Sequence, residues 1–470
     1  MNITEPTIQV GILSANEIEF VLNGTFASNG KNFSGKHKVA YHDGAIAFDG
    51  EYLKEIIFEP ACNEASFDLI DVVIGINFHW ERKENQRFKG ALKIIIETTH
   101  DVKTTHAVET THALSLLTAI NCISVEDYLT SVISSEMSAT ASEELLKAHA
   151  VISRSWLLNP IINTVTTKKD DSTHNAHATH AVKTTHALSL QQKTDKFIKW
   201  YERDAHTHFD VCADDHCQRY QGITRASTAA VEKAIESTRG EVLMYDGKIC
   251  DARFSKSCGG ASETFENCWA PEHHPYLTKV VDNPTEPAGF ELDLTVEANA
   301  EKWIRQSPEA FCNTADKKVL AQVLNNYDQE TTDFYRWKVE YMQAELSEIV
   351  TRRSGIDFGQ IIDMIPVKRG ESGRIIELKI IGTKRSIIVG KELEIRKWLS
   401  NSHLYSSAFV VDASDIIDGI PQHFSLTGAG WGHGVGLCQI GAAVMGEKGY
   451  TYDKILLHYF RGAELKKIYL

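Results

Sequence analysis

The chain has 470 residues, too many for one ordinary hydrophobic core, so we expect two or three folded units. Its formal net charge of -14 and the lack of a basic tract argue against a nucleic-acid partner, because phosphate binding needs clustered Lys and Arg. No apolar run reaches about 18 residues, and the first residues lack the basic and apolar regions of an export signal. We therefore expect no membrane span and no export signal in this chain.

Residues 8–97 contain short alternating apolar runs, such as 18–22, 45–48 and 92–96, separated by Asn-Gly, Asp-Gly and similar turns. This period predicts half-buried strands. Between 125 and 158 the apolar residues recur every three or four positions, which predicts two helices that meet near Glu136.

Two stretches rich in Thr-Thr-His-Ala units, 97–116 and 171–190, interrupt this pattern, and residues 106–116 recur almost unchanged at 180–190. They are interpreted as inserted low-complexity segments, because two distant copies do not form the short fixed period of a solenoid. Their histidines could bind Zn or Ni adventitiously, or the segments could simply be loops that carry an inserted repeat.

The second half of the chain is mixed. We expect a helix at 229–237, strands near 242–245 and 252–254, a mostly helical region at 291–356 with a strand at 337–341, and alternating strands at 361–394. Grouped strands predict an α+β fold rather than a regular βα alternation. The predicted regions are a strand-rich N-terminal part at 1–97, a first inserted repeat at 98–117, a catalytic core at 118–290 that contains the second repeat, a mixed insertion at 291–420, and a glycine-rich cleft segment at 421–470.

Glu136 is the candidate catalytic residue, because it lies between the two predicted helices. Partly desolvated by Val132, Met137 and Trp156, its carboxyl group could keep a proton near neutral pH and act as a general acid. The alternative is an ordinary helix-end cap or a solvated carboxylate. Arg154 on the second helix could pair with Glu136 or with a substrate.

A second cluster of chemically active side chains lies at 206–217. Its members have the residue types and density of a tetrahedral zinc site, with His206 or His208 completing a set of Cys212, His216 and Cys217. The alternatives are a disulfide between Cys212 and Cys217, or two free thiols in a reducing compartment. The chain has nine cysteines, so at least one thiol is unpaired or bound to something else.

Two glycine-containing segments complete the candidates. Cys258, next to Gly259 and Gly260, could be a nucleophile with His433 as its base, although a substrate-binding turn is the favoured interpretation. Residues 430–436 place four glycines around Trp431 and His433, a density typical of a turn that shapes a site or of a tight turn in a core.

Taken in order, these motifs resemble the stage II sporulation protein D family of peptidoglycan lytic transglycosylases and amidase enhancers. The segments that carry the resemblance are 125–137, 146–155, 212–222, 254–269, 428–441 and 456–465. The resemblance implies cleavage of the β-1,4 bond between N-acetylmuramic acid and N-acetylglucosamine in glycan strands, with Glu136 as the acid. A lytic transglycosylase needs only one carboxyl group, because the muramic acid 6-hydroxyl attacks C1 and closes a 1,6-anhydro ring, whereas a hydrolase uses a second carboxylate.

The resemblance also implies other features of the site. A structural zinc ion would be held by the Cys/His segment, and no organic cofactor is expected. The substrate-binding candidates are Arg154, Ser257, Cys258, Gly259, Gly260, Trp431, His433, Gln439 and Tyr459. The expected partners are glycan strands and a cell-wall amidase, and the expected location is extracytoplasmic. The alternative function is a wall-binding protein that enhances a separate amidase without turnover. An inserted repeat that disturbed the packing near Glu136 could abolish activity.

Overall fold

The computed structural model describes residues 3–74, 82–98, 115–138, 141–170, 196–201, 206–214, 217–224, 227–323 and 332–470. The described chain forms two units, each presented here by itself. Unit 1 comprises residues 1–154, 204–242 and 466–470, and unit 2 comprises residues 155–203 and 243–465. The predicted catalytic core at 118–290 therefore contributes to both units. No helix among the described residues is long and apolar enough to cross a membrane.

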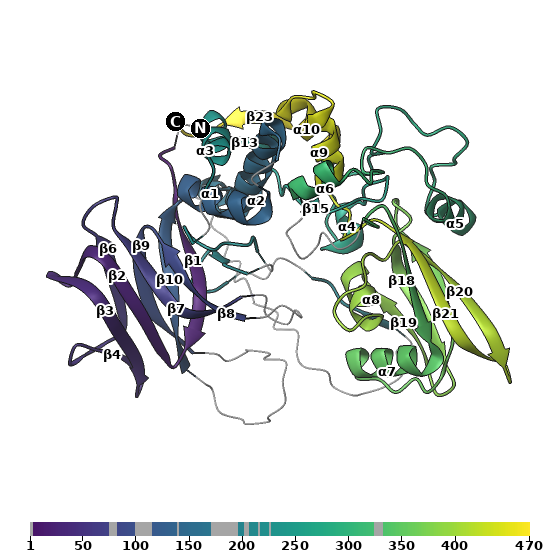
Figure 1. Ribbon diagram of the computed structural model, residues 1–470, viewed down its shortest axis with the longest axis horizontal. Coiled ribbons are helices and arrows are strands. Elements are labelled where there is room, and N and C mark those ends of the chain that lie inside the picture. The colour runs from purple at the N-terminus through teal and green to yellow at the C-terminus, as the bar shows by residue number, and fades with distance from the viewer. Residues whose placement is uncertain are drawn as a thin grey trace. The chain divides into compact units, whose positions relative to one another are not determined.

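Unit 1 is built on one large sheet, with strands in the order β12-β1-β10-β9-β6-β2-β3-β4-β5; β7 pairs with β2, and β8 with β7 (Figure 1). Its strands are β1 (Thr7–Ala15), β2 (Glu17–Ser28), β3 (Lys31–His42), β4 (Ala45–Phe48), β5 (Glu51–Leu53), β6 (Glu55–Pro60), β7 (Ser66–Ile74), β8 (Arg82–Phe88), β9 (Ala91–Thr98), β10 (Ser115–Ser124) and β12 (Val211–Cys212). Alternate residues point into a core that contains Phe20, Phe58 and Phe67. The predicted N-terminal strands are thus confirmed.

The first inserted repeat connects two neighbouring strands. β9 and β10 pair antiparallel, and the pairing runs up to Thr98 opposite Ser115. The pairing of β9 with β10 is therefore regular up to the residues that flank the repeat, Thr98 and Ser115. The repeat's own residues at 99–114, like the second repeat at 171–190, lie outside the described residues, and so do their histidines.

The helices of unit 1 follow the sheet in the chain. α1 (Val125–Glu136) begins at Ser124, whose side chain accepts a hydrogen bond from the Asp127 backbone and so caps the helix. α2 (Glu143–Asp170) starts in unit 1 and continues into unit 2. α3 (Ala229–Ser237) has the bounds expected from the sequence.

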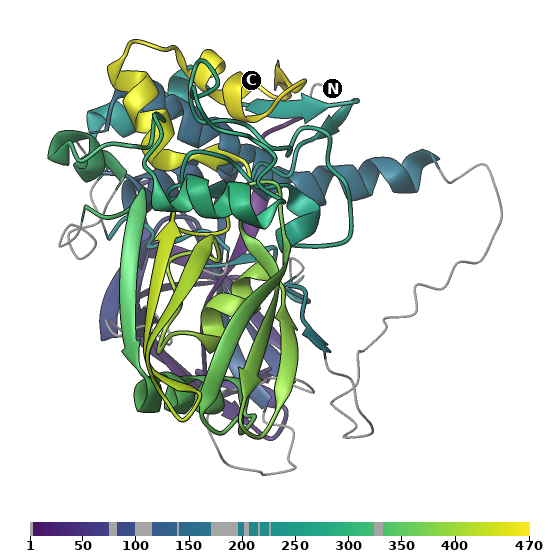
Figure 2. The same ribbon diagram turned by 90° about the vertical axis from the view of Figure 1, so that its right-hand side faces the viewer.

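Unit 2 combines small sheets with short helices (Figure 2). Its strands are β11 (Lys196–Ile198), β13 (Glu241–Tyr245), β14 (Lys248–Ile249), β15 (Phe254–Ser255), β16 (Arg336–Met342), β17 (Ile361–Arg369), β18 (Ile375–Gly382), β19 (Ser386–Gly390), β20 (Phe409–Ile417), β21 (Ile420–Ala429), β22 (Leu437–Cys438) and β23 (Glu464–Lys467), of which β13 and β23 extend into unit 1. Its helices are α4 (Phe265–Cys268), α5 (Glu297–Arg305), α6 (Lys317–Val323), α7 (Gln343–Ser354), α8 (Glu392–Trp398), α9 (Gln439–Glu447) and α10 (Tyr452–Tyr459).

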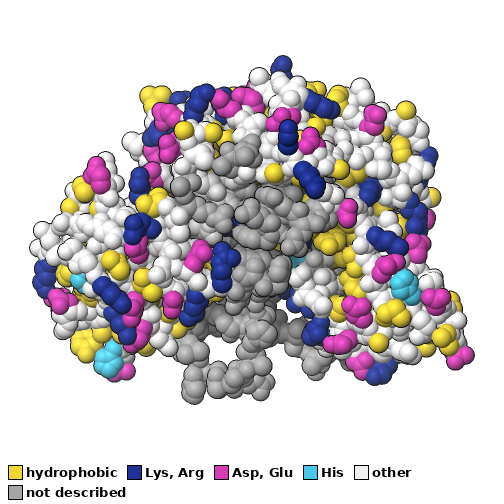
Figure 3. All heavy atoms as spheres, in the orientation of Figure 1, with side chains coloured by type: hydrophobic (Ala, Val, Ile, Leu, Met, Phe, Trp, Pro, Cys, Tyr) yellow, Lys and Arg dark blue, Asp and Glu magenta, His cyan; other side chains and the backbone are white. Residues whose placement is uncertain are grey.

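One core of unit 2 joins α7 and α8 to the strands β16 to β21 and contains Trp337, Trp398 and Phe424. The predicted α+β class is confirmed, with grouped strands in both halves of the chain. The region 291–356 is less helical than expected, because 306–316, which contains Pro308, is irregular between α5 and α6. On the face drawn in Figure 3, basic and acidic side chains of the described residues are intermixed.

Candidate functional site

Glu136 is the last residue of α1 and lies just before the turn to α2, as the sequence predicts. Its side chain is half-buried, whereas its neighbours Val132 and Met137 are buried at 0% and 4% exposure. The backbone N–H of Arg219 donates a hydrogen bond of 3.2 Å to Glu136 Oε1. The carboxyl group is thus held in place at a partly apolar helix end, and its role as a proton donor stays a prediction.

The chain that supplies this hydrogen bond runs along α1. Gln218 Oε1 accepts a hydrogen bond from the Tyr128 hydroxyl at 3.3 Å, and the Gln221 backbone N–H donates to Ser131 Oγ at 3.2 Å. The Tyr220 ring stacks on Tyr128 with ring centroids 5.0 Å apart. Residues 218–221 are therefore fixed against the helix that carries Glu136.

The same segment begins at the Cys/His cluster. β12 pairs parallel with β1, with Val10 opposite Val211 and Gly11 opposite Cys212. Gly11 has to be a glycine, because a Cβ there would lie 2.6 Å from the Phe209 ring. The Phe209 ring in turn stacks on His206, with centroids 4.5 Å apart. Packing on β1 therefore positions the histidine beside the two cysteines.

His206, Cys212 and Cys217 bring their ligand atoms within 4.8 Å of one another, and His206 Nε2 lies 3.4 Å from Cys217 Sγ. Imidazole and thiolate ligands at this separation fit a tetrahedral zinc ion. His208 is exposed and is not a member of this group, so of the two candidate histidines His206 lies near both cysteines. His216 lies outside the described residues. The structure has no disulfide between Cys212 and Cys217, which disagrees with the disulfide alternative.

The structure does not support Arg154 as a substrate-binding residue, because its side chain is buried and paired within the protein. Its side chain is 0% exposed, and its Nε and Nη2 donate to the two carboxylate oxygens of Glu126 at 3.0 and 2.6 Å. Glu126 Oε1 also accepts hydrogen bonds from the Gly240 N–H at 3.2 Å and the Tyr469 hydroxyl at 2.6 Å. This buried pair links α1, α2 and the last residues of the chain, and so we assign Arg154 to the packing of unit 1.

In unit 2 the glycine-rich turn at 430–436 packs against the loop that follows β15. Ser257 and Trp431 form a β-bridge, and a Cβ at Gly259 would lie 2.8 Å from the Gly430 nitrogen. Gly259 and Gly260 both have positive φ, at 77° and 103°. Glycine is therefore required at Gly259 for the close approach of two backbones as well as for its own conformation.

A buried charge network that sequence reasoning missed supports this turn. Arg374 is 0% exposed and donates to the carbonyls of Gly432 and Cys258 and, at 3.0 Å, to Ser372 Oγ. Ser372 Oγ donates to Glu263 Oε2 at 2.6 Å. A lone Arg in a strand pattern gives no sequence signal for such a network, because its partners are mainly backbone carbonyls.

His433 and Trp431 are half-buried in this turn. His433 Nδ1 accepts a 3.0 Å hydrogen bond from the Val435 backbone, which puts the proton of the neutral ring on Nε2. Burial lowers the pKa of His433 well below its usual value, and nearby Arg253 and Arg374 lower it further. The ring is therefore neutral at neutral pH, and it packs edge-on against Trp269 with centroids 5.0 Å apart.

Several other predicted binding residues are enclosed in the protein. Ser257, Gln439 and Tyr459 are 0%, 3% and 1% exposed, and the Tyr459 hydroxyl donates to Asp282. Cys258 is 3% exposed, and burial raises the pKa of its thiol well above the usual value. Burial and the raised pKa both disfavour the thiolate form that a thiol hydrolase needs, so the structure gives no support to Cys258 as a nucleophile. These four side chains belong to the interior of unit 2 rather than to a substrate surface.

Comparison with known proteins finds a family match over the segment that carries Glu136 and the Cys/His cluster. Residues 114–245, which contain Glu136 and the Cys/His cluster, match the family described as stage II sporulation protein. Over this segment the chain is similar to the stage II sporulation protein family. Residues 263–436 match a separate domain of unknown function.

Curated relatives support the same family. Stage II sporulation protein D of Bacillus amyloliquefaciens is 23% identical over 74% of this chain and 76% of that protein. An uncharacterized protein of Brachyspira hyodysenteriae is 25% identical over 74% of this chain and 68% of its own length. The amidase enhancer of Bacillus subtilis is 23% identical over 50% of this chain, and the match spans only 32% of that protein. These similarities support a role of this chain connected with the cell wall.

Proposed function

We propose that this chain is a peptidoglycan lytic transglycosylase with Glu136 as its general acid. The observation that supports this most is the placement of Glu136, half-buried at the end of α1 within the matched family segment, with one oxygen held by the Arg219 backbone. A fixed carboxyl group at a partly apolar surface suits proton transfer to a bound sugar.

In the proposed reaction, protonated Glu136 donates its proton to the oxygen that bridges muramic acid and glucosamine, and the bond from C1 to that oxygen breaks. The 6-hydroxyl of the muramic acid attacks C1, and its proton passes to the Glu136 carboxylate. The acid is regenerated, the glucosamine leaves with a free 4-hydroxyl, and no water is consumed. One carboxyl group thus serves as acid and then as base.

The chemistry of His206, Cys212 and Cys217 fits a structural zinc ion, and His216 is the candidate for the fourth ligand. Four protein ligands would leave no open position for catalysis, so the ion would supply a cross-link only. That cross-link would hold residues 217–221, and through Arg219 the carboxyl group of Glu136. We expect Cys212→Ser to remove one zinc ion per chain as measured by atomic absorption; an unchanged zinc content would contradict this assignment.

The identity of the reaction can be tested with glycan strands stripped of stem peptides, in water enriched in ¹⁸O. We expect products ending in 1,6-anhydro-muramic acid that contain no solvent oxygen, as measured by mass spectrometry. Products that carry ¹⁸O at a reducing end would show hydrolysis and would contradict the transglycosylase proposal.

The second candidate is a non-catalytic enhancer of a cell-wall amidase, which the similarity to the amidase enhancer of Bacillus subtilis favours. In this case the chain would bind glycan strands without cleaving them and would raise the rate of an added amidase. Wall fragments incubated with amidase, with and without the chain, separate the two functions. Amidase stimulation that persists in Glu136→Gln, with no anhydro products from wild type, would favour the enhancer. Either function places the chain outside the cytoplasm, where peptidoglycan lies.

A further inference from the structure

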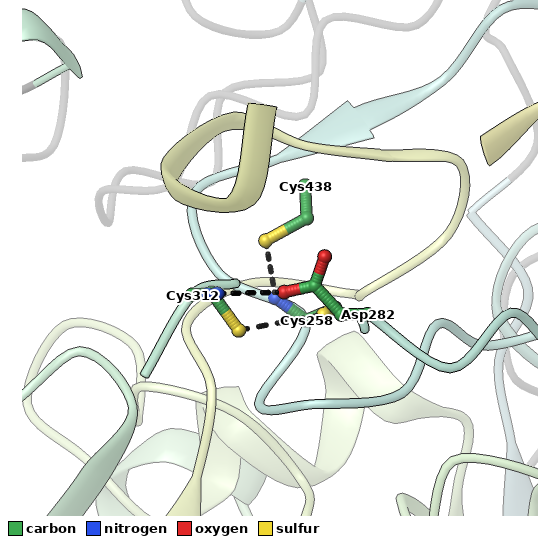
Figure 4. A group of neighbouring side chains, drawn as sticks. All are labelled: Cys258, Asp282, Cys312 and Cys438. Carbon is green, nitrogen blue, oxygen red and sulfur yellow. Dashed lines mark hydrogen bonds between the residues drawn. The ribbon is translucent and has the colours of Figure 1, made fainter. Parts of the chain in front are cut away.

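Four potential metal ligands converge inside unit 2, away from any residue that the proposed function uses (Figure 4). They are Cys258 after β15, Asp282, Cys312 and Cys438 at the start of α9, with exposures of 3%, 0%, 1% and 0%. Their ligand atoms all lie within 4.8 Å of one another. Three sulfurs and one carboxylate from four separate segments thus converge in the interior of unit 2.

The spacing fits a single tetrahedral ion. Cys258 Sγ and Cys312 Sγ are 3.7 Å apart. Zinc–sulfur bonds of about 2.3 Å would separate two sulfurs in a tetrahedron by about 3.8 Å. A disulfide requires about 2.05 Å, and Cys258, Cys312 and Cys438 form no disulfide in the structure. The observed separation therefore fits two ligands of one metal ion.

Hydrogen bonds already orient the ligands. Cys438 Sγ accepts from the backbone N–H groups of Cys258 at 3.2 Å and of Gly441 at 3.4 Å. Asp282 accepts from the Cys312 N–H on Oδ2 at 2.8 Å and from the Tyr459 hydroxyl on Oδ1 at 2.6 Å. Outer hydrogen bonds of this kind fix ligand orientation at metal sites. They also explain Gly441, where a Cβ would lie 2.3 Å from the Tyr459 hydroxyl oxygen.

Positive side chains near the cluster would offset the negative charge of a zinc ion with four anionic ligands. Three thiolates and one carboxylate outweigh the two positive charges of a zinc ion, and burial of that excess is costly without nearby positive charge. Arg374 donates to the Cys258 carbonyl at 3.1 Å, and Arg336 donates to the neighbouring Gly259 carbonyl at 3.1 Å. Two guanidinium groups thus lie on the loop that carries the first ligand.

We propose that Cys258, Asp282, Cys312 and Cys438 bind one zinc ion as a structural site, separate from the Cys/His cluster of unit 1. With four protein ligands, the ion is coordinatively closed and acts as a cross-link. Cys438 begins α9 and Cys258 precedes Gly259, which contacts Gly430. The ion therefore fastens both flanks of the glycine-rich turn to the 282 and 312 segments.

Metal analysis of the full chain isolates this site when the Cys/His cluster is removed by Cys212→Ser together with Cys217→Ser. In that background we expect one zinc ion per chain, as measured by plasma mass spectrometry. The further change Cys312→Ser or Asp282→Asn should lower the content to near zero. Cys250→Ser is the matched control, because Cys250 is a buried cysteine outside both clusters, and it should keep the ion. Zinc retained in both ligand variants would overturn the proposal.

A second measurement guards against variants that fail to fold. In the same background with Cys312 intact, cobalt replacement should give the visible bands of a tetrahedral ion and the near-ultraviolet bands of sulfur ligands. Without reductant, thiols counted in denaturant with a chelator should include Cys258, Cys312 and Cys438. A folded, metal-free chain with no cobalt bands, or a disulfide among these three cysteines, would contradict the site.

Discussion

The ion pair between Glu126 and Arg154 shows how a predicted site residue can be structural. Both carboxylate oxygens and two guanidinium nitrogens are used within unit 1, and both side chains are buried. The removal of one partner from such a pair leaves an uncompensated buried charge, which typically costs about 3 to 5 kcal/mol. Removal of one member of the pair therefore tests how much this buried ion pair contributes to holding the end of the chain against α1 and α2.

We predict that Glu126→Gln lowers the free energy of unfolding by about 3 to 5 kcal/mol, because Arg154 loses its counter-charge while it stays buried. Urea unfolding followed by circular dichroism measures this change. Glu51→Gln, which breaks the exposed Lys31–Glu51 pair, is the control and should have little effect. Equal, small effects of both changes would show that Arg154 gains nothing from Glu126.

Histidines of unit 2 predict a pH dependence of stability. Burial lowers the pKa of His403 to about 4 and of His458 to about 4, from 6.5. As the pH falls, the two histidines are protonated in the unfolded chain at a higher pH than in the folded protein. The contribution of the neutral histidines to folding stability is therefore complete above about pH 6.5 and is lost as the pH falls toward 4. His458→Gln should therefore lose less stability than wild type between pH 7 and pH 5.

The measurement for this prediction is urea unfolding of both proteins at pH 7 and pH 5. The change in unfolding free energy between pH 7 and pH 5 is calculated for each protein. The difference between the wild-type change and the His458→Gln change gives the contribution of His458 alone. His42→Gln, an exposed histidine, should follow wild type. A wild-type chain and a His458→Gln chain with parallel pH profiles would contradict the assignment.

At the scale of elements, the inserted repeat at 97–116 joins two strands that are paired to their ends. We predict that replacement of residues 99–114 by Asn-Gly leaves the melting temperature and any glycan-cleaving activity close to wild type, because Thr98 and Ser115 already face each other as a hairpin turn requires. Thermal melts and product analysis test this. Loss of folding would show that the repeat has a structural part.

The glycine-rich turn gives a second test at this scale. Gly434 has a φ of 77°, and a Cβ there would lie 2.4 Å from the Arg374 guanidinium carbon, whereas Gly419 has a similar φ of 79° and open space. Both changes to Ala incur the left-handed strain of about 1 to 2 kcal/mol. Gly434→Ala should therefore lower the free energy of unfolding more than Gly419→Ala does. Chemical unfolding of both variants measures this difference. Equal effects would show that Arg374 moves aside freely.

The local pattern of the sequence predicts many of these elements. The alternation at 45–48 and the helical spacing at 229–237 give β4 and α3 with their observed bounds, because each is set by its own apolar period and turn residues. The helix prediction is wrong around Pro308, because charged residues in a sequence resemble the solvated face of a helix whether or not a helix forms.

At the scale of the whole chain, the candidate site divides into features that a sequence can show and features that it cannot. The junction at Glu136 and the density of Cys and His at 206–217 are local signals, and both appear in unit 1. The partner of Arg154 and the grouping of Cys258 with Asp282, Cys312 and Cys438 depend on tertiary contacts across long separations. Periodicity and motif spacing carry no information on such contacts.

The central claim is that Glu136 donates the proton that breaks the glycan bond. The most direct measurement is the rate at which anhydro-muramic ends form from stripped glycan strands, compared between wild type, Glu136→Gln and Glu143→Gln. Glu143 is the control, because its half-exposed carboxylate pairs with Lys147 and Lys233. The account predicts a loss of about 10² to 10⁴ in rate for Glu136→Gln and none for Glu143→Gln. Equal rates of anhydro-product formation in wild type and Glu136→Gln would contradict it.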